Sequence, residues 1–406
     1  MTNNIPQNAL QFVQSPAAQR RPLGLSLSGG GFRATLFHLG AIRRLDEFGV
    51  LQHVDTLSSV SGGSILNGFL SSRLKGSISA GIANFGNEVS APVREFCAQD
   101  IRRWLALEAV IPGTHNSAAL AKRYDENLTN GMTLAAIPKT PIHIFSATDL
   151  AYGVNWMFKQ AECGDYQAGF FQTPPTWKLG TAIAASSCFP PVFKPMNLNL
   201  DPAALKGGRV PPGPVRDKCV REITFSDGGV YDNLGLEPIW KDHDYVLASD
   251  GGALFSVGGD TGFSWEVGRY IAIPENQALA VRKRWLISNF IARETNGPNY
   301  GINGTYWGIG GACSDYGINH GYSKDLATNY IATIRTDLDS FSEAEASVLE
   351  NHGYWLADAA IRTHVPGLIF VDPPVQIPNP EWPADAEDKI KESLRDSRKR
   401  TLLGHG

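Results

Sequence analysis

The sequence lacks the features that mark several classes of protein. It has no apolar run of about 18 residues, the length that predicts a membrane-spanning helix. Residues 1–22 are polar and lack the apolar core of a secretory signal, so we expect an N-terminal tail. The 36 Lys and Arg are outnumbered by 40 Asp and Glu, so the basic excess typical of nucleic acid binding is missing. We therefore expect no nucleic acid polymer as a partner.

Cysteine is also scarce, and no two of the five stand at the spacing of a metal site. Scattered cysteines in odd number predict free thiols, which persist in a reducing compartment. We therefore expect a cytoplasmic protein. The five are Cys97, Cys163, Cys188, Cys219 and Cys313.

What the sequence does contain is an alternation of strand-like and helix-like segments. The apolar run 23–27 predicts a buried strand, and residues 33–48 carry apolar side chains at helical spacing up to Gly49. A second pair follows, with a strand predicted at 54–59 and a helix at 64–74. Such alternation predicts an α/β domain whose parallel sheet is covered by helices on both faces.

Later segments extend this pattern. Residues 341–363 predict a helix, because Ser342 and Glu345 form a capping box at its start. We expect one domain over residues 23–375, followed by a charged tail over residues 376–406. Further strands are predicted at 142–147, 222–225, 245–248 and 330–334, and irregular stretches at 197–214 and 295–322.

Small-residue turns follow the first two predicted strands. Gly29, Gly30 and Gly31 follow the first, where their N–H groups can point at one spot. Ser61 follows the second, in the segment 59–63, which reads Ser-Val-Ser-Gly-Gly. This is close to the Gly-x-Ser-x-Gly turn that exposes a nucleophilic serine, with Ser in the first position. An anion cradle and a nucleophile are two of the three parts of an acyl-transfer site.

The glycine run also has an alternative interpretation, as a dinucleotide-binding turn. Gly29, Gly31 and Ala34 fit the relaxed form of that fingerprint, which needs an acidic residue at the end of the next strand. Asp55 has about the right spacing but precedes the strand, and the chain has no Gly-x-x-x-x-Gly-Lys motif. A non-catalytic nucleotide-binding module is therefore a remote alternative.

The third part of an acyl-transfer site is a base, and the chain offers two similar aspartates. Asp227 and Asp250 each follow a predicted strand and precede two glycines, and spacing alone does not choose between them. A Ser–Asp–His triad is an alternative to a dyad, although no histidine stands in a comparable glycine-flanked turn. The histidines in the required order are His243, His320, His352 and His364.

Taken together, these motifs resemble the patatin-like phospholipase family. The resemblance covers residues 23–252 and includes the segments 146–150 and 184–191, whereas residues 253–375 diverge. It implies a three-layer fold with a mainly parallel central sheet flanked by helices. It also implies a catalytic dyad of Ser61 and Asp227, an aspartate that Asp232 and Asn233 follow. The implied oxyanion hole is the backbone of Gly29, Gly30 and Gly31, and the implied role of Arg33 is structural or anion-binding.

The resulting hypothesis is a lipid acyl hydrolase that needs no metal or cofactor. Its substrate would be a phospholipid or another acyl ester, reached by peripheral contact with the inner membrane, and the basic segment 282–284 can contact anionic headgroups. The alternative is a ligand-gated phospholipase of anti-phage defence, in which a cyclic nucleotide is the small-molecule activator. The segment 295–322 would hold that activator.

Overall fold

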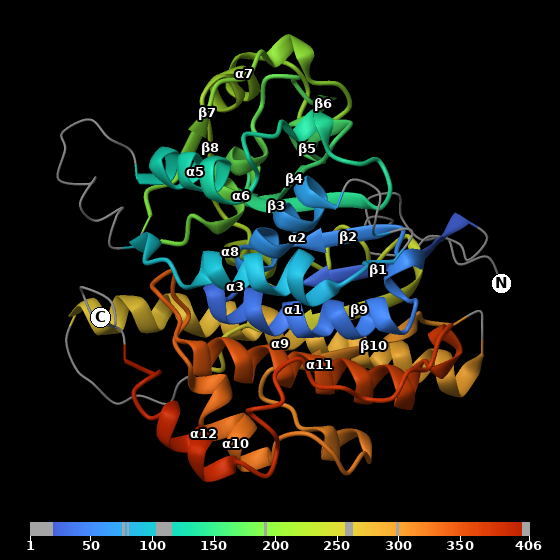
Figure 1. Ribbon diagram of the computed structural model, residues 1–406. Helices are drawn as coiled ribbons and strands as arrows, with labels where there is room; N and C mark the ends of the chain where they lie inside the picture. Colours follow the sequence, from blue (N-terminus) through green and yellow to red (C-terminus); the bar gives the residue numbers. More distant parts are fainter. Residues whose placement is uncertain are drawn as a thin grey trace.

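A ten-stranded sheet crosses the middle of the molecule (Figure 1). The computed structural model describes residues 19–74, 78, 81–102, 116–190, 193–255, 263–297 and 300–399. Five strands in the order β10-β9-β1-β2-β3 are parallel, as expected for strands joined by helices. They are β1 (Arg21–Leu27), β2 (Thr56–Ser59), β3 (Ile142–Asp149), β9 (His243–Asp250) and β10 (Asn303–Gly308).

Beyond β3 the sheet becomes antiparallel, which the sequence pattern had not indicated. The second half of β3 pairs with β4 and also with β8, and the pairing of Ala147 with Asp227 sets the register of β8. The antiparallel strands are β4 (Val154–Phe158), β5 (Glu162–Asp165), β6 (Gly169–Gln172), β7 (Met196–Leu198) and β8 (Ile223–Asp227). They form the upper lobe in Figure 1.

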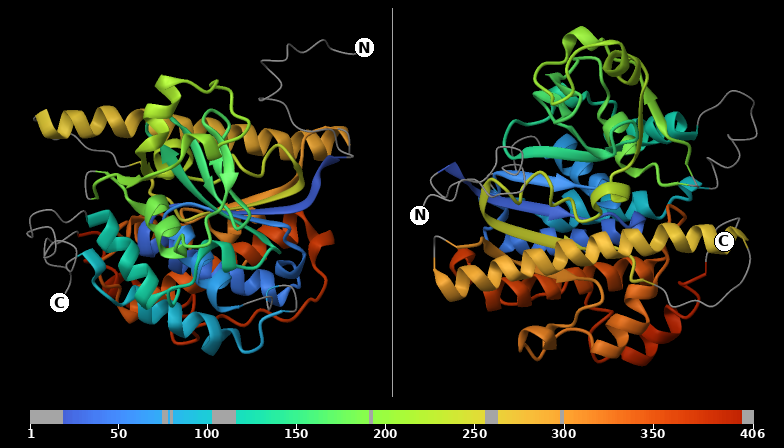
Figure 2. Two further views of the ribbon diagram at one scale, coloured as in Figure 1. Left: turned by 90° about the horizontal axis from the view of Figure 1, so that it is seen from above. Right: turned by 180° about the vertical axis from the view of Figure 1, so that it is seen from behind.

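Helices cover both faces of the parallel half, so the predicted three-layer α/β fold is confirmed (Figure 2). One face holds α1 (Gly31–Glu47), α2 (Gly62–Arg73), α3 (Ala91–Cys97) and α11 (Glu343–His364). The other face holds α9 (Phe263–Asn296). Side chains of β9 alternate between the layers: Val246 and Ala248 pack toward α9, and Leu247 packs toward α1 and α11.

The capping box at the start of α11 is confirmed, because Ser342 Oγ accepts from the Glu345 N–H and the Glu345 carboxylate accepts from the Ser342 N–H.

Shorter helices complete the fold. The shorter helices are α5 (Asn116–Asn127), α6 (Leu179–Ser187), α7 (Pro214–Arg221), α8 (Gly229–Asp232), α10 (Lys324–Asn329) and α12 (Glu387–Ser393).

Three expectations about the C-terminal part were wrong or incomplete. The strand predicted at 330–334 is a 3₁₀ turn, Ile331–Thr333. The stretch 295–322 is not a long loop, because it contains the edge strand β10. In the predicted charged tail, Trp382, Ile390 and Leu394 are buried against the core. The division of the chain at residues 22 and 375 stays a prediction, and residues 1–18 and 400–406 lie outside the described ones.

All five cysteines are free, and four of them are buried. No helix among the described residues is both long enough and apolar enough to cross a membrane.

Candidate active site

Ser61 occupies a sharp turn between β2 and α2. Its φ of 48° lies in the left-handed region, a costly conformation for a residue other than glycine, and it is 9% exposed. The next two glycines allow the close packing of this turn. A Cβ atom at Gly62 would lie 2.1 Å from the Gly31 carbonyl oxygen, and one at Gly63 would lie 2.4 Å from that of Leu27. The sequence therefore presents Ser61 at the carboxyl end of β2, as the elbow pattern predicts.

Ser186, near the C-terminus of α6, braces this turn. The Ser61 N–H donates to the carbonyl oxygen of Ser186 at 3.1 Å and to its Oγ at 3.0 Å, and that hydroxyl donates to the Ser146 carbonyl at 2.6 Å. The same carbonyl of Ser186 accepts from the Gly228 N–H at 3.2 Å. Ser146 and Ser186 thus hold the Ser61 turn and the Asp227 loop together. The segments 146–150 and 184–191 that contain them contribute to the family resemblance of the sequence, but no role for Ser186 was predicted from it.

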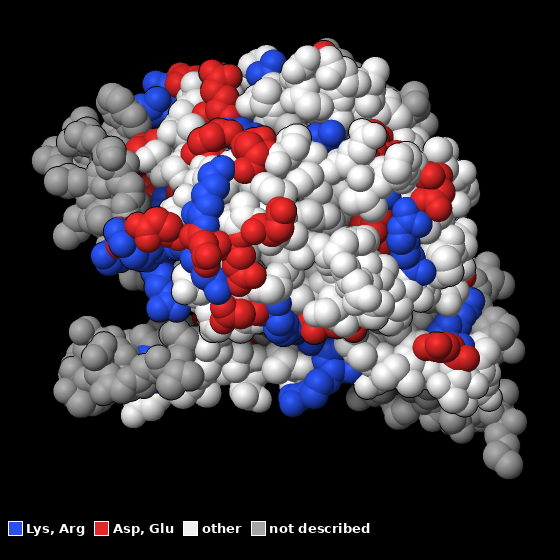
Figure 3. All heavy atoms as spheres, turned by 60° about the horizontal axis from the view of Figure 1, so that its bottom comes forward, with Lys and Arg blue, Asp and Glu red and all other residues white. Residues whose placement is uncertain are grey.

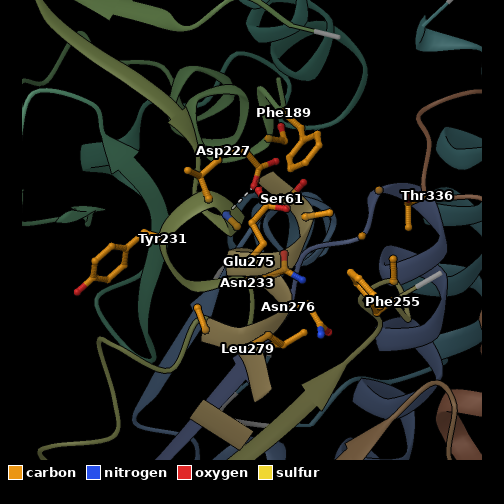
Figure 4. A pocket seen from close by; sticks show the side chains of 18 of the residues that line it. Ser61, Phe189, Asp227, Tyr231, Asn233, Phe255, Glu275, Asn276, Leu279 and Thr336 are labelled. Carbon is orange, nitrogen blue, oxygen red and sulfur yellow. Dashed lines mark hydrogen bonds between the residues drawn. The ribbon is translucent and has the colours of Figure 1, made fainter. Parts of the chain in front are cut away.

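Asp227 ends β8 and faces Ser61. Its Oδ1 accepts from the Gly229 N–H at 2.7 Å, and the Ser61 side chain lies beside its carboxylate in the same cavity. Burial raises the pKa of Asp227 to about 7, although the Gly229 N–H and the nearby Ser61 hydroxyl oppose the rise, and the negative charge of Glu275 contributes to it. Figure 4 shows the Ser61 and Asp227 side chains next to each other. A carboxylate with this pKa can accept a proton near neutral pH.

Asp250, the other aspartate at a strand end, is differently placed. Its Oδ2 lies 2.5 Å from Lys283 Nζ and accepts from the Tyr306 hydroxyl at 2.7 Å. Burial alone would raise the pKa of Asp250, but the Lys283 ammonium and these hydrogen bonds hold it below its usual value. The geometry therefore favours Asp227 over Asp250 as a base.

The candidate histidines do not reach Ser61, and none of them lines the cavity that contains it. His320 lies 3.3 Å from Asp358, and His364 packs against Tyr316. His243 and His352 hydrogen-bond to the carbonyl oxygens of Ile239 and Ile309, respectively.

The three glycines of the predicted oxyanion hole differ in their bonding. The Gly29 N–H donates to the Asn233 carbonyl at 3.0 Å, so it is already occupied. A Cβ atom at Gly29 would lie 2.3 Å from Asn233 Oδ1, which accounts for a glycine there. Gly30 and Gly31 have φ of 140° and 57°, line the cavity, and have no bonded partner for their N–H groups among the described residues. Only these two are free to bind an oxyanion.

Arg33, on the first turn of α1, is buried and bonds to backbone carbonyls. Its guanidinium donates to the carbonyl oxygen of Gly251 at 2.9 and 3.2 Å, to Ala332 at 3.1 Å and to Ile334 at 2.7 Å. It is not part of the cavity lining. These contacts tie α1 to two distant segments, so they support the structural alternative for Arg33.

Ser61 and Asp227 open into a cavity of about 350 Å³. Its walls combine apolar side chains with charged and polar ones, and one side is formed by the N-terminal half of α9, which the sequence had not indicated as part of the site. The helix was missed because its apolar residues occupy both of its sides and Pro274 interrupts it. Lining residues near the dyad include Phe189, Phe193, Tyr231, Asn233, Phe255, Glu275, Asn276 and Leu279 (Figure 4).

No group of three His, Cys, Asp or Glu side chains that could hold a metal occurs in the part of the chain that the structure describes. The groups in the cavity that are suited to acyl transfer are the Ser61 hydroxyl, the Asp227 carboxylate with its raised pKa, and the backbone N–H groups of Gly30 and Gly31.

The family model for patatin-like phospholipases matches residues 25–240. The chain belongs to this family. Membership supports lipid hydrolysis as the general class of activity, and the matched region contains the elbow, the glycine run and Asp227 but not α9.

The chain also resembles solved structures at low sequence identity. Human GIVD cytosolic phospholipase A2, in complex with methyl gamma-linolenyl fluorophosphonate inhibitor and terbium chloride, is 12% identical with a TM-score of 0.47; the match covers 97% of this chain and 62% of that chain. VipD from Legionella pneumophila is 11% identical with a TM-score of 0.37, and the match covers 86% and 68%. In a second structure of the human enzyme, the match spans 46% of its chain. No curated protein sequence matches significantly.

Proposed function

We propose that the protein is a phospholipase A-type lipid acyl hydrolase with a Ser61–Asp227 dyad. The observation that carries the proposal is that a serine in a left-handed turn lies beside a buried carboxylate with a pKa of about 7 within one cavity. A base with a pKa near the working pH combines a useful ionised fraction with proton affinity.

In the acylation step, Asp227 takes the proton of Ser61 while Oγ bonds to the ester carbonyl carbon. The carbonyl oxygen becomes an alkoxide, which the N–H groups of Gly30 and Gly31 stabilise because they have no other described partner. The intermediate collapses as the ester C–O bond breaks, and Asp227 returns its proton to the leaving alcohol. An acyl-serine remains.

Deacylation repeats the sequence with water as the nucleophile. Asp227 takes a proton from the water, the hydroxide bonds to the acyl carbon, and the released Ser61 alkoxide recovers the proton from Asp227. The products are a fatty acid and a lysophospholipid, and no metal or cofactor takes part. Apolar side chains such as Phe189, Phe193 and Leu279 line the cavity that would hold the acyl chain.

Nothing in the part of the chain that the structure describes supports the ligand-gated alternative. The segment 295–322, which was expected to be an activator-binding loop, contributes β10 to the central sheet, and Trp307 within it is fully buried. Activation by a cyclic nucleotide therefore stays a prediction, and activity of the purified protein without any added ligand would contradict it.

The proposal is tested with Ser61→Ala. We expect loss of fluorophosphonate labelling and a fall of at least about 10³-fold in fatty acid release from both phospholipid vesicles and a soluble ester. Product analysis by mass spectrometry should show lysophospholipid from the wild type. Retention of full activity by Ser61→Ala would refute the dyad.

Ser58→Ala is the matched control. Ser58 lies on β2 close to Ser61, is buried, and its Oγ has no described hydrogen-bond partner, so its removal should leave labelling and turnover near wild-type levels.

A further inference from the structure

Exposed apolar side chains concentrate around the cavity and on α9. Among the described residues, fifteen large apolar side chains are exposed. Five of them lie on α9 and four others line the cavity, so nine of the fifteen belong to α9 or to the cavity. The five on α9 are Tyr270, Ile273, Val281, Ile287 and Ile291; the four at the cavity are Phe189, Val230, Leu254 and Phe255.

The five α9 residues form a stripe along one side of the helix, here called the outer stripe. At 100° per residue they fall within an arc of about 120°. Tyr270 is 71% exposed, and Val281 and Ile291 are each 56% exposed. Figure 2 (right) shows α9 lying across the back of the sheet, with no described helix or strand over its outer side. The outer stripe therefore has no partner within the described chain.

The opposite side of α9 faces the protein. Leu279, Leu286 and Phe290 pack there against β9 and its neighbours. The cations on this inner side are neutralised by ion pairs: Arg282 with Asp232 at 3.4 Å, Lys283 with Asp250 at 2.5 Å and Arg293 with Asp244 at 3.4 Å. These charged side chains of α9 are therefore paired on the side that faces the protein, and its apolar stripe is exposed on the other side. An ordinary surface helix has the opposite arrangement.

Charge on the outer side is sparse and positive. Between Tyr270 and Ile291, the arc contains the exposed Arg284 and no acidic side chain. A contrasting surface is the face turned forward in Figure 3, near α10 and α12, where acidic and basic side chains are intermixed. An apolar stripe with a single cation suits a lipid surface, which accepts apolar side chains and tolerates arginine at the headgroups.

We propose that the outer stripe of α9, together with the exposed apolar side chains at the cavity, is the surface by which the protein docks on a phospholipid bilayer. The choice of a bilayer as the partner rests on the proposed function, because the same helix forms a wall of the cavity that holds Ser61 and Asp227. The cavity lies on the protein-facing side of α9, so docking by the outer stripe would bring it to within about one helix diameter, roughly 10 Å, of the membrane. The stripe lies outside residues 25–240, which the family model matches.

The test measures partitioning of the full chain onto sucrose-loaded vesicles of phosphatidylcholine containing phosphatidylglycerol. Every variant carries Ser61→Ala, so that the vesicles stay intact. Val281→Glu and Ile291→Glu each place a charge in the outer stripe, and we expect each to lower the partition coefficient about tenfold or more. Because Arg284 is the only cation in the arc between Tyr270 and Ile291 among the described side chains, raising the salt concentration should weaken binding only slightly.

Val215→Glu is the matched control. Val215 lies on α7 in the antiparallel lobe and is 77% exposed, and it belongs neither to α9 nor to the cavity. The same change there should leave partitioning unchanged. With Ser61 intact, the α9 variants should lose hydrolysis of vesicle lipid while keeping the wild-type rate on a soluble short-chain ester, which also shows that they are folded.

Three results would overturn the docking proposal. They are absence of wild-type partitioning, equal partitioning of the Val281→Glu/Ile291→Glu double variant and the wild type, and a solution dimer that this double variant dissociates without any change in partitioning. The last result would assign the stripe to a second copy of the chain. If partitioning depends on α9 but no ester is hydrolysed, the docking surface stands and the proposed function fails.

Discussion

The ends of β8 and β9 carry the same four residues, Ser-Asp-Gly-Gly, and yet they have different chemistry. In both, the aspartate Oδ1 accepts from the N–H group two residues on, at 2.7 Å for Asp227 and 2.9 Å for Asp250. Both carboxylates are buried. Both copies therefore form the same local hydrogen bond at the aspartate, although the chain continues as helix α8 after Asp227 and without regular secondary structure after Asp250.

The difference lies in what approaches each carboxylate from elsewhere in the chain. Asp227 meets the neutral hydroxyl of Ser61, whereas Asp250 meets the Lys283 ammonium. Desolvation dominates where no cation is present, so the pKa of Asp227 rises to about 7, and the ion pair dominates at Asp250, whose pKa is lowered. One copy of the motif is thus suited to accept a proton, and the other anchors α9 to the sheet.

The largest expected effect is on activity, which should fall far more when Asp227 is replaced than when Asp250 is replaced. Asp227→Asn should lower kcat/KM by about 10²–10⁴-fold, since it removes the general base while keeping the hydrogen bond from Gly229. Asp250→Asn should lower it by less than about tenfold. Steady-state kinetics on a soluble ester measure both, and a greater loss in Asp250→Asn would reverse the assignment of the base.

Replacing the same two aspartates by asparagine should also change the free energy of unfolding, in opposite directions. The folded-state pKa of Asp227, about 7, exceeds its unfolded value, so its stabilising contribution is complete at acid pH and is lost as the pH rises through 7. The free energy of unfolding of Asp227→Asn, taken relative to that of the wild type at the same pH, should therefore increase by about 2–3 kcal/mol between pH 5 and pH 8. Asp250→Asn should lose about 1–3 kcal/mol at neutral pH, because it breaks the contact with Lys283.

Urea denaturation at the two pH values measures these changes in the free energy of unfolding. A gain for Asp227→Asn that did not change with pH would show that Asp227 titrates normally in the folded protein.

A smaller effect is expected from Glu275, which lines the cavity and whose charge contributes to the raised pKa of Asp227. Hydrolysis requires ionised Asp227, so kcat/KM should rise with pH through about 7. Glu275→Gln removes the repulsion and should shift that rise to lower pH by roughly 0.3–1 pH unit. Asn276→Asp, on the next residue of the same helix, should shift it in the opposite direction. An unchanged pH profile in both variants would show that charge on α9 does not influence Asp227.

The elements near the glycine and serine motifs were predictable because their signals are local. Helical spacing predicted α1, and small residues around Ser61 predicted the turn before α2, each to within a few residues. The capping box predicted the start of α11. Each of these features depends on residues within about one turn of one another, where side-chain spacing and capping act directly.

The missed elements depend on distant partners. β10 lies in a stretch rich in glycine and aromatics, and it becomes a strand because β9 offers an open edge for pairing. Residues 331–333 have the apolar character of a strand, but they form a 3₁₀ turn whose buried Ile331 and Ala332 join the core. Gly29 could not be separated from Gly30 and Gly31 before the Asn233 carbonyl was seen to occupy its N–H.

By itself, the sequence determined the α/β architecture, the elbow that presents Ser61 and the presence of two equivalent aspartates. Only the tertiary structure decided which aspartate keeps a proton affinity suited to a base, which glycine N–H groups remain open, and that Arg33 binds carbonyls. It also decided that α9 forms a wall of the cavity. The physical reason is range: capping and turn preferences act over a few residues, whereas desolvation and ion pairing depend on groups that folding brings together from far apart in the chain.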